Sequence, residues 1–488
     1  MAQHDDAPWT LHPDRALPAE PGLRALAREI YGHIAALPIV SMHGHVDAGA
    51  IARDEGFGDA AELLVMPDHY VLRMLVSRGV RFEQLGIARR AGAASAEREL
   101  PVETDHREIW RRFCAQWPAF RGTPSRYWLE HELVELLGVT REPSPATADA
   151  IYDELAETLA KPQHRIRAMF DRFGIELLST TDPATSGLED HAALARDGWG
   201  ERVVPTFRPD ALYHPHTAHW REHLTLLAER SGIDVGDLAG FLEALRERRR
   251  AFVAAGARAS DHGHRTPDTT PLPAGEAERL YAEALRGPLD VASSEAFAAH
   301  LLFETARMSL DDGLVMQLHP GIVRDHSPAL AARYGADIGF DIPEPVTFTR
   351  GLRPLLDAFG HEPGFRIILF TVDESSYSRE LAPLAGAYPS VLLGAPWWFL
   401  DAPGGLARFR ELTTETAGFF NTSGFVDDTR AFASIPARHD LARRIDAGYL
   451  AKLVGEHRLG LDEAIETAIA LTSTLPRSAY ARPAVAGG

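Results

Sequence analysis

Two histidines separated by a single glycine are the residues of this sequence best suited to metal chemistry. His43 and His45 follow residues 38–42, a short apolar run with the composition of a buried strand. Residues i and i+2 of an extended segment share a face, and the intervening glycine permits close approach, so both imidazoles can reach one ion. The triplet predicts a metal site at a strand end, with a pair of surface histidines as the alternative.

Further ligands for the same ion are predicted at the ends of two later apolar runs. His319 follows residues 314–318, and Asp428 comes shortly after residues 424–426. Two or three histidines with a carboxylate suit Zn2+, and also Mn2+, Fe2+ or Co2+. We therefore expect a divalent metal ion, Zn2+ in the first place, bound by four side chains: His43, His45, His319 and Asp428.

Two of these ligands have a structural alternative. His319 could be a core histidine bonded to a backbone carbonyl, and Asp428 could cap the N-terminus of a helix. Of the two neighbouring aspartates, Asp427 is the better candidate for a mere cap.

Eight short apolar runs rich in β-forming residues would position these side chains, and helical patterns lie between most of them. Alternating strands and helices imply a parallel sheet, and eight strands predict an α/β fold of the (β/α)8 TIM barrel type, with catalytic groups at the carboxyl ends of the strands. A doubly wound sheet is the alternative. The eight runs are residues 38–42, 175–179, 203–207, 254–259, 314–318, 366–370, 391–393 and 424–426.

About 130 residues separate the first two runs, far more than one barrel helix requires. We therefore expect a large helical insertion after the first strand, with helices at residues 69–76, 107–117, 126–137 and 146–159, the first capped by Asp68 and the last by Ser144-Pro145. The predicted division of the chain is 1–51 for the N-terminal segment and first strand, 52–170 for the insertion, 171–480 for the remainder of the barrel and 481–488 for a loose tail.

Composition excludes several classes of protein. Of the 488 residues, 45% are hydrophobic and 24% charged, as in globular proteins with a large core. The net charge of -19 argues against a nucleic-acid partner, and no basic leader or membrane-length apolar run is present, so we expect a cytoplasmic protein with no membrane partner. Barrels with helical excursions often associate, so a homo-oligomer is expected. The single cysteine, Cys114, is interpreted as a buried structural residue.

The pattern of two histidines on strand one, a histidine on strand five and an aspartate on strand eight resembles the amidohydrolase superfamily. Two parts of its binuclear members are missing. The fourth run is followed by Ser260-Asp261-His262 without a lysine, and the sixth is followed by Thr371-Val372-Asp373 without a histidine. The whole chain contains only Lys161 and Lys452, which leaves almost no candidate for a carboxylated-lysine bridge. One metal ion is therefore expected, not two.

A series of short motifs makes the resemblance more specific, because their order is similar to that of the uronate isomerase family from about residue 11 to 480. The chain departs from the family at Arg324-Asp325-His326-Ser327, where Asn-rich sequence is usual, and at Pro183, where a second aspartate often stands. The matching motifs are Asp68-His69-Tyr70, Thr180-Thr181-Asp182, Pro205-Thr206-Phe207-Arg208, Ser260-Asp261-His262, Gln317-Leu318-His319, Gly339-Phe340-Asp341, Trp397-Trp398-Phe399 and Asp428-Thr429-Arg430.

This resemblance implies an aldose-ketose isomerase that interconverts D-glucuronate with D-fructuronate and D-galacturonate with D-tagaturonate by proton transfer between C2 and C1 through an enediol. Asp428 can be the base, and Tyr70 is its rival, so both are retained as a proton-shuttling pair. Arg208 and Arg430 are expected to hold the substrate carboxylate or the enediolate, since guanidinium binds such oxygens bidentately. Packing is the alternative for Tyr70, and ion pairing is the alternative for the arginines.

Three further predictions concern the surroundings of the reaction. His69 is expected among the catalytic groups, although it could be only a helix residue beside Tyr70, and His319 and Trp397 are expected to contact the sugar acid. His262-Gly263-His264 copies the first triplet but is not counted as a metal site, because a loop follows it and no second set of carboxylates accompanies it. A mononuclear metal-dependent hydrolase and a non-catalytic sugar-acid binding protein are the competing functions.

Overall fold

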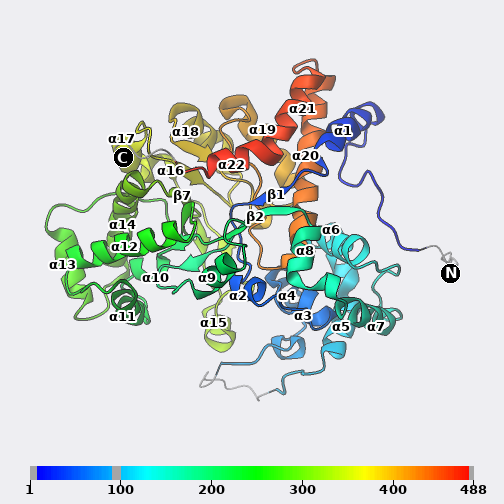
Figure 1. The fold of residues 1–488 in the computed structure, drawn as a ribbon, viewed down its shortest axis with the longest axis horizontal. Coiled ribbons are helices and arrows are strands. Elements are labelled where there is room, and N and C mark those ends of the chain that lie inside the picture. Colours follow the sequence, from blue (N-terminus) through cyan, green and yellow to red (C-terminus); the bar gives the residue numbers. More distant parts are fainter. Residues whose placement is uncertain (1–7, 91–99, 483–488) are drawn as a thin grey trace.

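Parallel strands form the centre of the molecule (Figure 1). The computed structural model describes residues 8–90 and 100–482. One sheet holds β1 (Ile39–Ser41), β2 (Ile175–Ser179) and β4 (Val203–Val204) in that order. The other has the order β11-β10-β7-β6-β5-β3 and consists of β3 (Asp182–Pro183), β5 (Phe207–Arg208), β6 (Ala259–His262), β7 (Val315–Leu318), β10 (Ile367–Leu369) and β11 (Val391–Leu393).

The two sheets are parts of one wall, because β2 continues into β3 and β4 continues into β5. Thr180 N donates to Val204 O at 2.9 Å and Asp182 N donates to Thr206 O at 3.0 Å, which keeps the two runs paired across the interruption. Pro205 lies at the interruption and has no N–H to donate to a ladder. The strand predicted at residues 203–207 is therefore present but divided.

A segment at residues 421–429 that is not a regular strand closes the ring. Thr422 pairs in parallel with Leu393 of β11, and on the other side Asp428 N donates to His43 O at 3.2 Å, next to β1. This segment supplies the eighth wall position between β11 and β1. The fold is thus the (β/α)8 barrel expected from the sequence.

Two predicted strands are wrong in detail. Residues 424–426 form no regular strand, because Gly424 adopts a left-handed backbone with φ of 74° that interrupts a ladder. Residues 254–259 begin at the end of helix α12 (Leu238–Ala254) and turn through Gly256, with φ of 96°, so β6 starts only at the last of them. An apolar run of this length has the same composition at a helix end as in a strand.

The other predicted strands are confirmed to within one residue at each end: β1, β2, β7, β10 and β11. A short antiparallel ribbon of β8 (Ile322–Val323) and β9 (Ile342–Pro343) follows β7.

Helices dominate the segment between β1 and β2, as predicted. Asp68 caps α4 by accepting from Tyr70 N at 2.8 Å, whereas Ser144 Oγ accepts from Thr147 N at 3.2 Å one turn before α7 and Thr147 is the cap residue itself. The elements are α2 (Ala48–Ala52), α3 (Ala60–Leu64), α4 (His69–Ser77), α5 (His106–Gln116), α6 (Pro124–His131), α7 (Ala148–Leu159) and α8 (Ile166–Arg172), with single turns η1 (Phe82–Leu85), η2 (Trp117–Phe120), η3 (Glu132–Leu136) and η4 (Pro162–His164).

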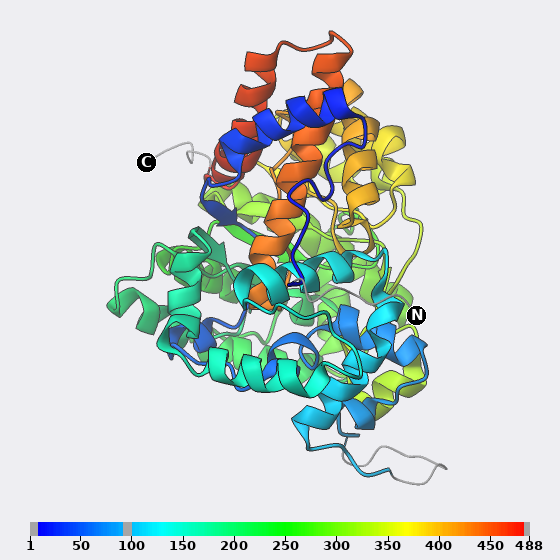
Figure 2. The same cartoon turned by 90° about the vertical axis from the view of Figure 1, so that its right-hand side faces the viewer.

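The insertion helices pack around a hydrophobic cluster that includes Trp110, Phe113 and Leu129, and Cys114 is buried in it as expected. Figures 1 and 2 place α3, α5 and α7 on one side of the barrel strands and α21 on the opposite side. The domain boundaries at residues 51 and 170 stay predictions. The predicted tail at residues 481–488 lies outside the described residues from position 483 onward.

Among residues 8–90 and 100–482, no helix combines the length and apolar character needed to cross a membrane.

The remaining helices cover the barrel and its ends. These helices are α1 (Pro21–Ile34), α9 (Glu189–Arg196), α10 (Asp210–Tyr213), α11 (Trp220–Ser231), α12, α13 (Glu276–Ala284), α14 (Val291–Asp312), α15 (Pro328–Tyr334), α16 (Phe348–Gly351), α17 (Arg353–Phe359), α18 (Ala382–Ala387), α19 (Pro403–Ala417), α20 (Ile435–Gly455), α21 (Leu461–Ile469) and α22 (Leu475–Ala479), with turns η5 (Tyr377–Leu381), η6 (Trp398–Leu400), η7 (Phe432–Ser434) and η8 (Ala470–Thr474).

Candidate active site

A cavity of about 220 Å³ opens at the carboxyl ends of the strands, and all the site residues predicted from the sequence line it. These residues come from β1, β5, β7, β11, the closing segment and helix α4, so the barrel brings together parts of the chain that are hundreds of residues apart. Its lining consists of His43, His45, His69, Tyr70, Arg73, Arg208, Asp261, His319, Arg324, Asp337, Gly339, Asp341, Trp397, Trp398, Phe399, Asp428 and Arg430.

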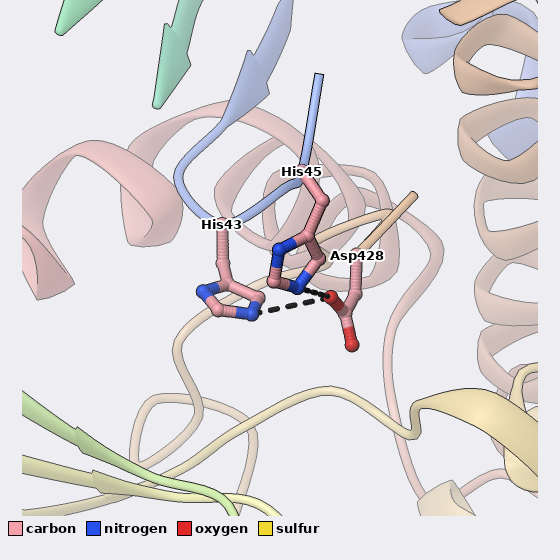
Figure 3. Close-up of side chains that lie close together, drawn as sticks. All are labelled: His43, His45 and Asp428. Atoms are coloured by element: carbon pink, nitrogen blue, oxygen red, sulfur yellow. Dashed lines mark ion pairs between the residues drawn. The ribbon is translucent and has the colours of Figure 1, made fainter. Parts of the chain in front are cut away.

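The two histidines of the first triplet converge on one carboxylate. His43 Nε2 lies 3.2 Å and His45 Nε2 lies 2.9 Å from Asp428 Oδ1. Figure 3 shows that both imidazoles, which come from the segment after β1, point at this oxygen, which belongs to the closing segment. The backbone after β1 and the turn at Asp428, with φ of 43°, thus bring three potential metal ligands together.

His319 approaches the same region through a second, overlapping group. Its Nδ1 lies 2.8 Å from Asp261 Oδ1, and its ring stacks on that of His43 with centroids 4.5 Å apart. His43, Asp261 and His319 form a second set of potential ligands that shares His43 with the first. The four predicted ligands are therefore neighbours, but His319 is grouped with Asp261 and not directly with Asp428.

The donor groups fit a cation. Asp428 Oδ1, Asp261 Oδ1 and both nitrogens of His319 are buried, yet none makes a well-directed hydrogen bond within the described structure. Buried polar atoms without a well-directed partner are costly, and a bound cation would satisfy them. A divalent metal ion therefore suits this end of the cavity.

Asp428 is held in its ionised form. Burial alone would raise the pKa of its carboxyl, but the neighbouring His43 and His45 imidazoles bring the pKa well below its usual range. The side chain is therefore a carboxylate at neutral pH, at the position that faces the cavity.

Tyr70 and His69 enter the cavity from the start of α4. Burial raises the pKa of Tyr70, so the phenol keeps its proton, and its hydroxyl has no hydrogen-bond partner in the described part of the chain. Burial, with Arg430 and Arg438 nearby, lowers the pKa of His69 to about 3, so this imidazole is neutral. Two neutral polar groups thus face the cavity without being used by the fold.

Arginines supply the positive charge of the cavity. Arg208 Nε donates to Asp210 Oδ2 at 3.0 Å, and its Nη1 lies 3.3 Å from Asp261 Oδ2, so two carboxylates fix this guanidinium. Arg430 is more exposed, with 38% of its side chain accessible, and lies 3.8 Å from Asp337. Both predicted arginines therefore line the site, the first rigidly and the second at its entrance.

Sequence reasoning missed several lining residues. Arg73 lies over the Phe399 ring, and Arg324 Nη1 donates to Asp341 Oδ2 at 2.9 Å while its guanidinium lies 5.1 Å from the Trp398 ring. Neither arginine has a spacing signal, because each depends on loops that meet only in the folded chain. Asp261 did have one, since it stands at the end of the fourth barrel strand.

Trp397 packs and also presents a polar edge. Its ring meets His319 edge-on at 4.8 Å and stacks on Trp398 at 5.2 Å, while its buried Nε1 has no partner among residues 8–90 and 100–482. The pair forms one aromatic wall of the cavity.

The prediction that Asp427 is a helix cap is wrong. Its Oδ2 accepts from Ser41 Oγ at 2.5 Å and lies 3.1 Å from His439 Nε2. The buried carboxylate therefore joins the closing segment to β1 and to α20, and this places its neighbour Asp428 beside the histidines.

Comparison with known proteins agrees with the geometry. The glucuronate isomerase family model matches residues 23–472. Uronate isomerases of Rhizobium meliloti and Rhizorhabdus wittichii are 51% and 52% identical over 470 and 474 residues, which cover 96% and 97% of this chain and 99% of each relative.

Solved structures give the same result. The crystal structure of glucuronate isomerase from Caulobacter crescentus is 47% identical, covers 99% of both chains and superposes with a TM-score of 0.93. That of uronate isomerase from Thermotoga maritima is 26% identical, covers 97% of this chain and 100% of its own, and has a TM-score of 0.89. The chain belongs to the uronate isomerase family.

Proposed function

We propose that the cavity isomerises hexuronates between aldose and ketose forms, taking D-glucuronate to D-fructuronate and D-galacturonate to D-tagaturonate. The observation that carries this proposal is the meeting of an ionised carboxylate, Asp428, with a neutral phenol, Tyr70, that has no hydrogen-bond partner among the described residues, in a cavity lined by arginines. Family membership favours this isomerase over a mononuclear hydrolase with the same ligands.

The arginines bind the negative parts of the substrate. Arg208 and Arg430 supply guanidinium groups that stay charged and can pair bidentately with a carboxylate or an enediolate. His319, which follows β7, and the Trp397 wall, which follows β11, would contact the sugar chain. A net charge of -19 makes these local cations necessary for an anionic substrate.

Asp428 and Tyr70 divide the proton transfers. The Asp428 carboxylate takes the proton from C2 of the open-chain aldose and later returns it to C1. The Tyr70 hydroxyl gives its proton to O1 and recovers one from O2, which leaves a carbonyl at C2. Charge that develops on the phenol faces the buried Arg438 guanidinium, whose central carbon lies 5.2 Å from the ring centroid. His69 would hydrogen-bond the same hydroxyls in its neutral form.

We also propose that one divalent metal ion, preferably Zn2+ but with Mn2+, Fe2+ or Co2+ as alternatives, is held in this cavity by His43, His45 and Asp428, with His319 beside them. Such an ion would polarise a carbonyl oxygen of the substrate and would thereby make the neighbouring C–H group more acidic. The residues around it hold and move the protons.

Incubation of the protein with a panel of hexuronates in deuterated buffer, followed by NMR, tests the proposal. Ketose formation with solvent exchange of the migrating proton is expected. Asp428→Asn should abolish both, whereas Asp357→Asn is the control for the same substitution, because this exposed aspartate of α17 does not line the cavity. Cleavage of a lactone without any ketose would indicate the hydrolase, and tight uronate binding without C2 exchange would indicate a binding protein.

Two properties of the whole protein are proposed from the sequence. We infer a homo-oligomer located in the cytoplasm. Light scattering during size-exclusion chromatography measures the mass of the assembly directly, and a monomeric mass would refute the first part. Fractionation of the source cells tests the second.

A further inference from the structure

A second group of potential metal ligands lies beside the first cavity. The carboxylate of Asp210, at the start of α10, meets His262 at the end of β6 and His264 two residues later. Each contributes one ligand atom, and these atoms all lie within 4.8 Å of one another. The cluster shares no residue with the His43, His45 and Asp428 group.

The donor atoms of this cluster are buried and unused. Within the described residues, Asp210 Oδ1, His262 Nδ1 and His264 Nε2 have no hydrogen-bond partner, and the two histidines are 0% and 3% exposed. Asp210 Oδ1 and His264 Nε2 lie 3.9 Å apart. Buried polar atoms of this kind are almost always satisfied in native proteins, by protein, water or an ion.

The surrounding fold holds these donors in place. Asp210 Oδ2 accepts from Gly263 N at 2.9 Å and from Arg208 Nε at 3.0 Å, so the other oxygen is left to face the imidazoles. His262 Nε2 lies 3.1 Å from Ser260 Oγ, which commits that nitrogen and leaves Nδ1 free. Asp210 and His262 are thus each fixed by a hydrogen bond made through the other polar atom of the side chain.

The charges beside the cluster are already balanced. The Arg208 guanidinium lies against the carboxylates of both Asp210 and Asp261, so one cation is shared by two anions and a further cation can be accommodated.

We propose that Asp210, His262 and His264 form a second divalent metal site, for a cation of the Zn2+, Co2+ or Ni2+ type. Two imidazole nitrogens and one carboxylate oxygen are a donor set that such ions prefer. The half-buried His214 is placed to approach as a fourth ligand, because its Nδ1 is also unpartnered in the described chain and its ring centroid lies 5.0 Å from that of His264. The prediction that no carboxylate accompanies the triplet His262-Gly263-His264 is therefore wrong, because the folded chain brings Asp210 beside it.

The second site also positions a residue of the first cavity. A cation on Asp210 Oδ1 keeps Oδ2 directed at Arg208, and Arg208 in turn reaches Asp261 at the cavity wall. Occupancy of the site would therefore fix the orientation of this arginine. The metal count does not depend on the proposed isomerisation.

Measurement of the metal content of the protein tests the proposal. The full-length protein is stripped with a chelator, dialysed against Co2+ and then against buffer, and analysed for bound metal and for the visible absorption of Co2+. The wild type should retain two ions per chain, and His264→Gln or Asp210→Asn should retain one. His45→Gln should also retain one, with the absorption of the other site.

A matched control is His216→Gln. This histidine is on the same loop as His214, but its Nδ1 is bonded to Ser294 Oγ at 2.7 Å, so the substitution should leave two ions bound. One ion in the wild type, or two ions in both His264→Gln and Asp210→Asn, would overturn the proposal.

Anomalous diffraction from wild-type crystals grown with Zn2+ covers the case in which the variants fail to fold. A peak between Asp210 Oδ1 and the two imidazoles is expected. Density at that point with no anomalous signal, as for a water molecule, would refute the second site.

Discussion

The variant Tyr70→Phe, which lacks only the phenolic oxygen, distinguishes a role of Tyr70 in packing from a role in proton transfer. The ring is 5% exposed and packs against Trp128 and the Arg438 guanidinium, while its hydroxyl has no partner in the parts of the chain described. Tyr70→Phe keeps the ring contacts and deletes a buried polar atom whose burial without a partner costs ~1–3 kcal/mol. The free energy of unfolding should therefore stay unchanged or rise by up to ~1 kcal/mol.

The activity should change in the opposite sense. A positioned proton donor contributes a factor of roughly 10² to 10⁴, so kcat of Tyr70→Phe should fall by about that factor while KM changes little. Denaturant unfolding gives the first quantity. An assay of ketose formation gives the second, and exchange of the C2 proton in deuterated buffer shows whether Asp428 still acts without the phenol.

Tyr281→Phe is the matched control, since Tyr281 is equally buried but its hydroxyl donates to Val235 O at 2.7 Å. This variant should lose ~1 kcal/mol of stability, because a buried carbonyl loses its donor, and it should keep its activity. If Tyr70→Phe lost stability like the control and retained its kcat, the hydroxyl would be structural and the assignment of Tyr70 to proton transfer would be refuted.

Three further outcomes are expected. In Gly263→Ala the new Cβ would lie 2.7 Å from Arg208 Nη2, so the guanidinium must move and KM for a hexuronate should rise roughly tenfold, equivalent to ~1.4 kcal/mol; steady-state kinetics with an unchanged KM would contradict this. Burial lowers the pKa of His131 to about 4 from an ordinary 6.5, so the unfolded chain binds this proton more tightly. Stability should therefore fall by up to ~3 kcal/mol as the pH drops from about 6.5 to 4, and a melting series should show a shallower fall in His131→Gln. Removal of metal with a chelator should lower Tm and added Zn2+ should restore it, since an ion at a hundred times its Kd stabilises by ~2.7 kcal/mol; identical melting curves would exclude a bound metal.

Features that depend on neighbours in the sequence were predictable. His43 and His45 share a face because an extended chain alternates, and Asp68 caps α4 because its carboxylate reaches amides two and three residues later. The positions of the strands were predictable only in part. Composition located β7, but it did not distinguish the end of α12 from the start of β6 at residues 254–259.

Closure of the barrel decided which predicted residues meet. Asp428 reaches His43 only because the segment at residues 421–429 lies between β11 and β1, and Asp427 secures that segment to Ser41 and His439. The parallel pairing of β6 with β7 places His319 against Asp261 and not against Asp428. No local pattern contains these distances, because they depend on the order of strands around the ring.

The sequence by itself determined the class of fold, the first histidine pair and the kinds of side chain at the strand ends, since each follows from local periodicity and residue type. Tertiary structure alone decided that Tyr70 has a neutral hydroxyl with no partner in the described part of the chain and that Asp210 joins His262 and His264. Burial and the meeting of distant segments set both properties, and neither is encoded in the spacing of residues along the chain.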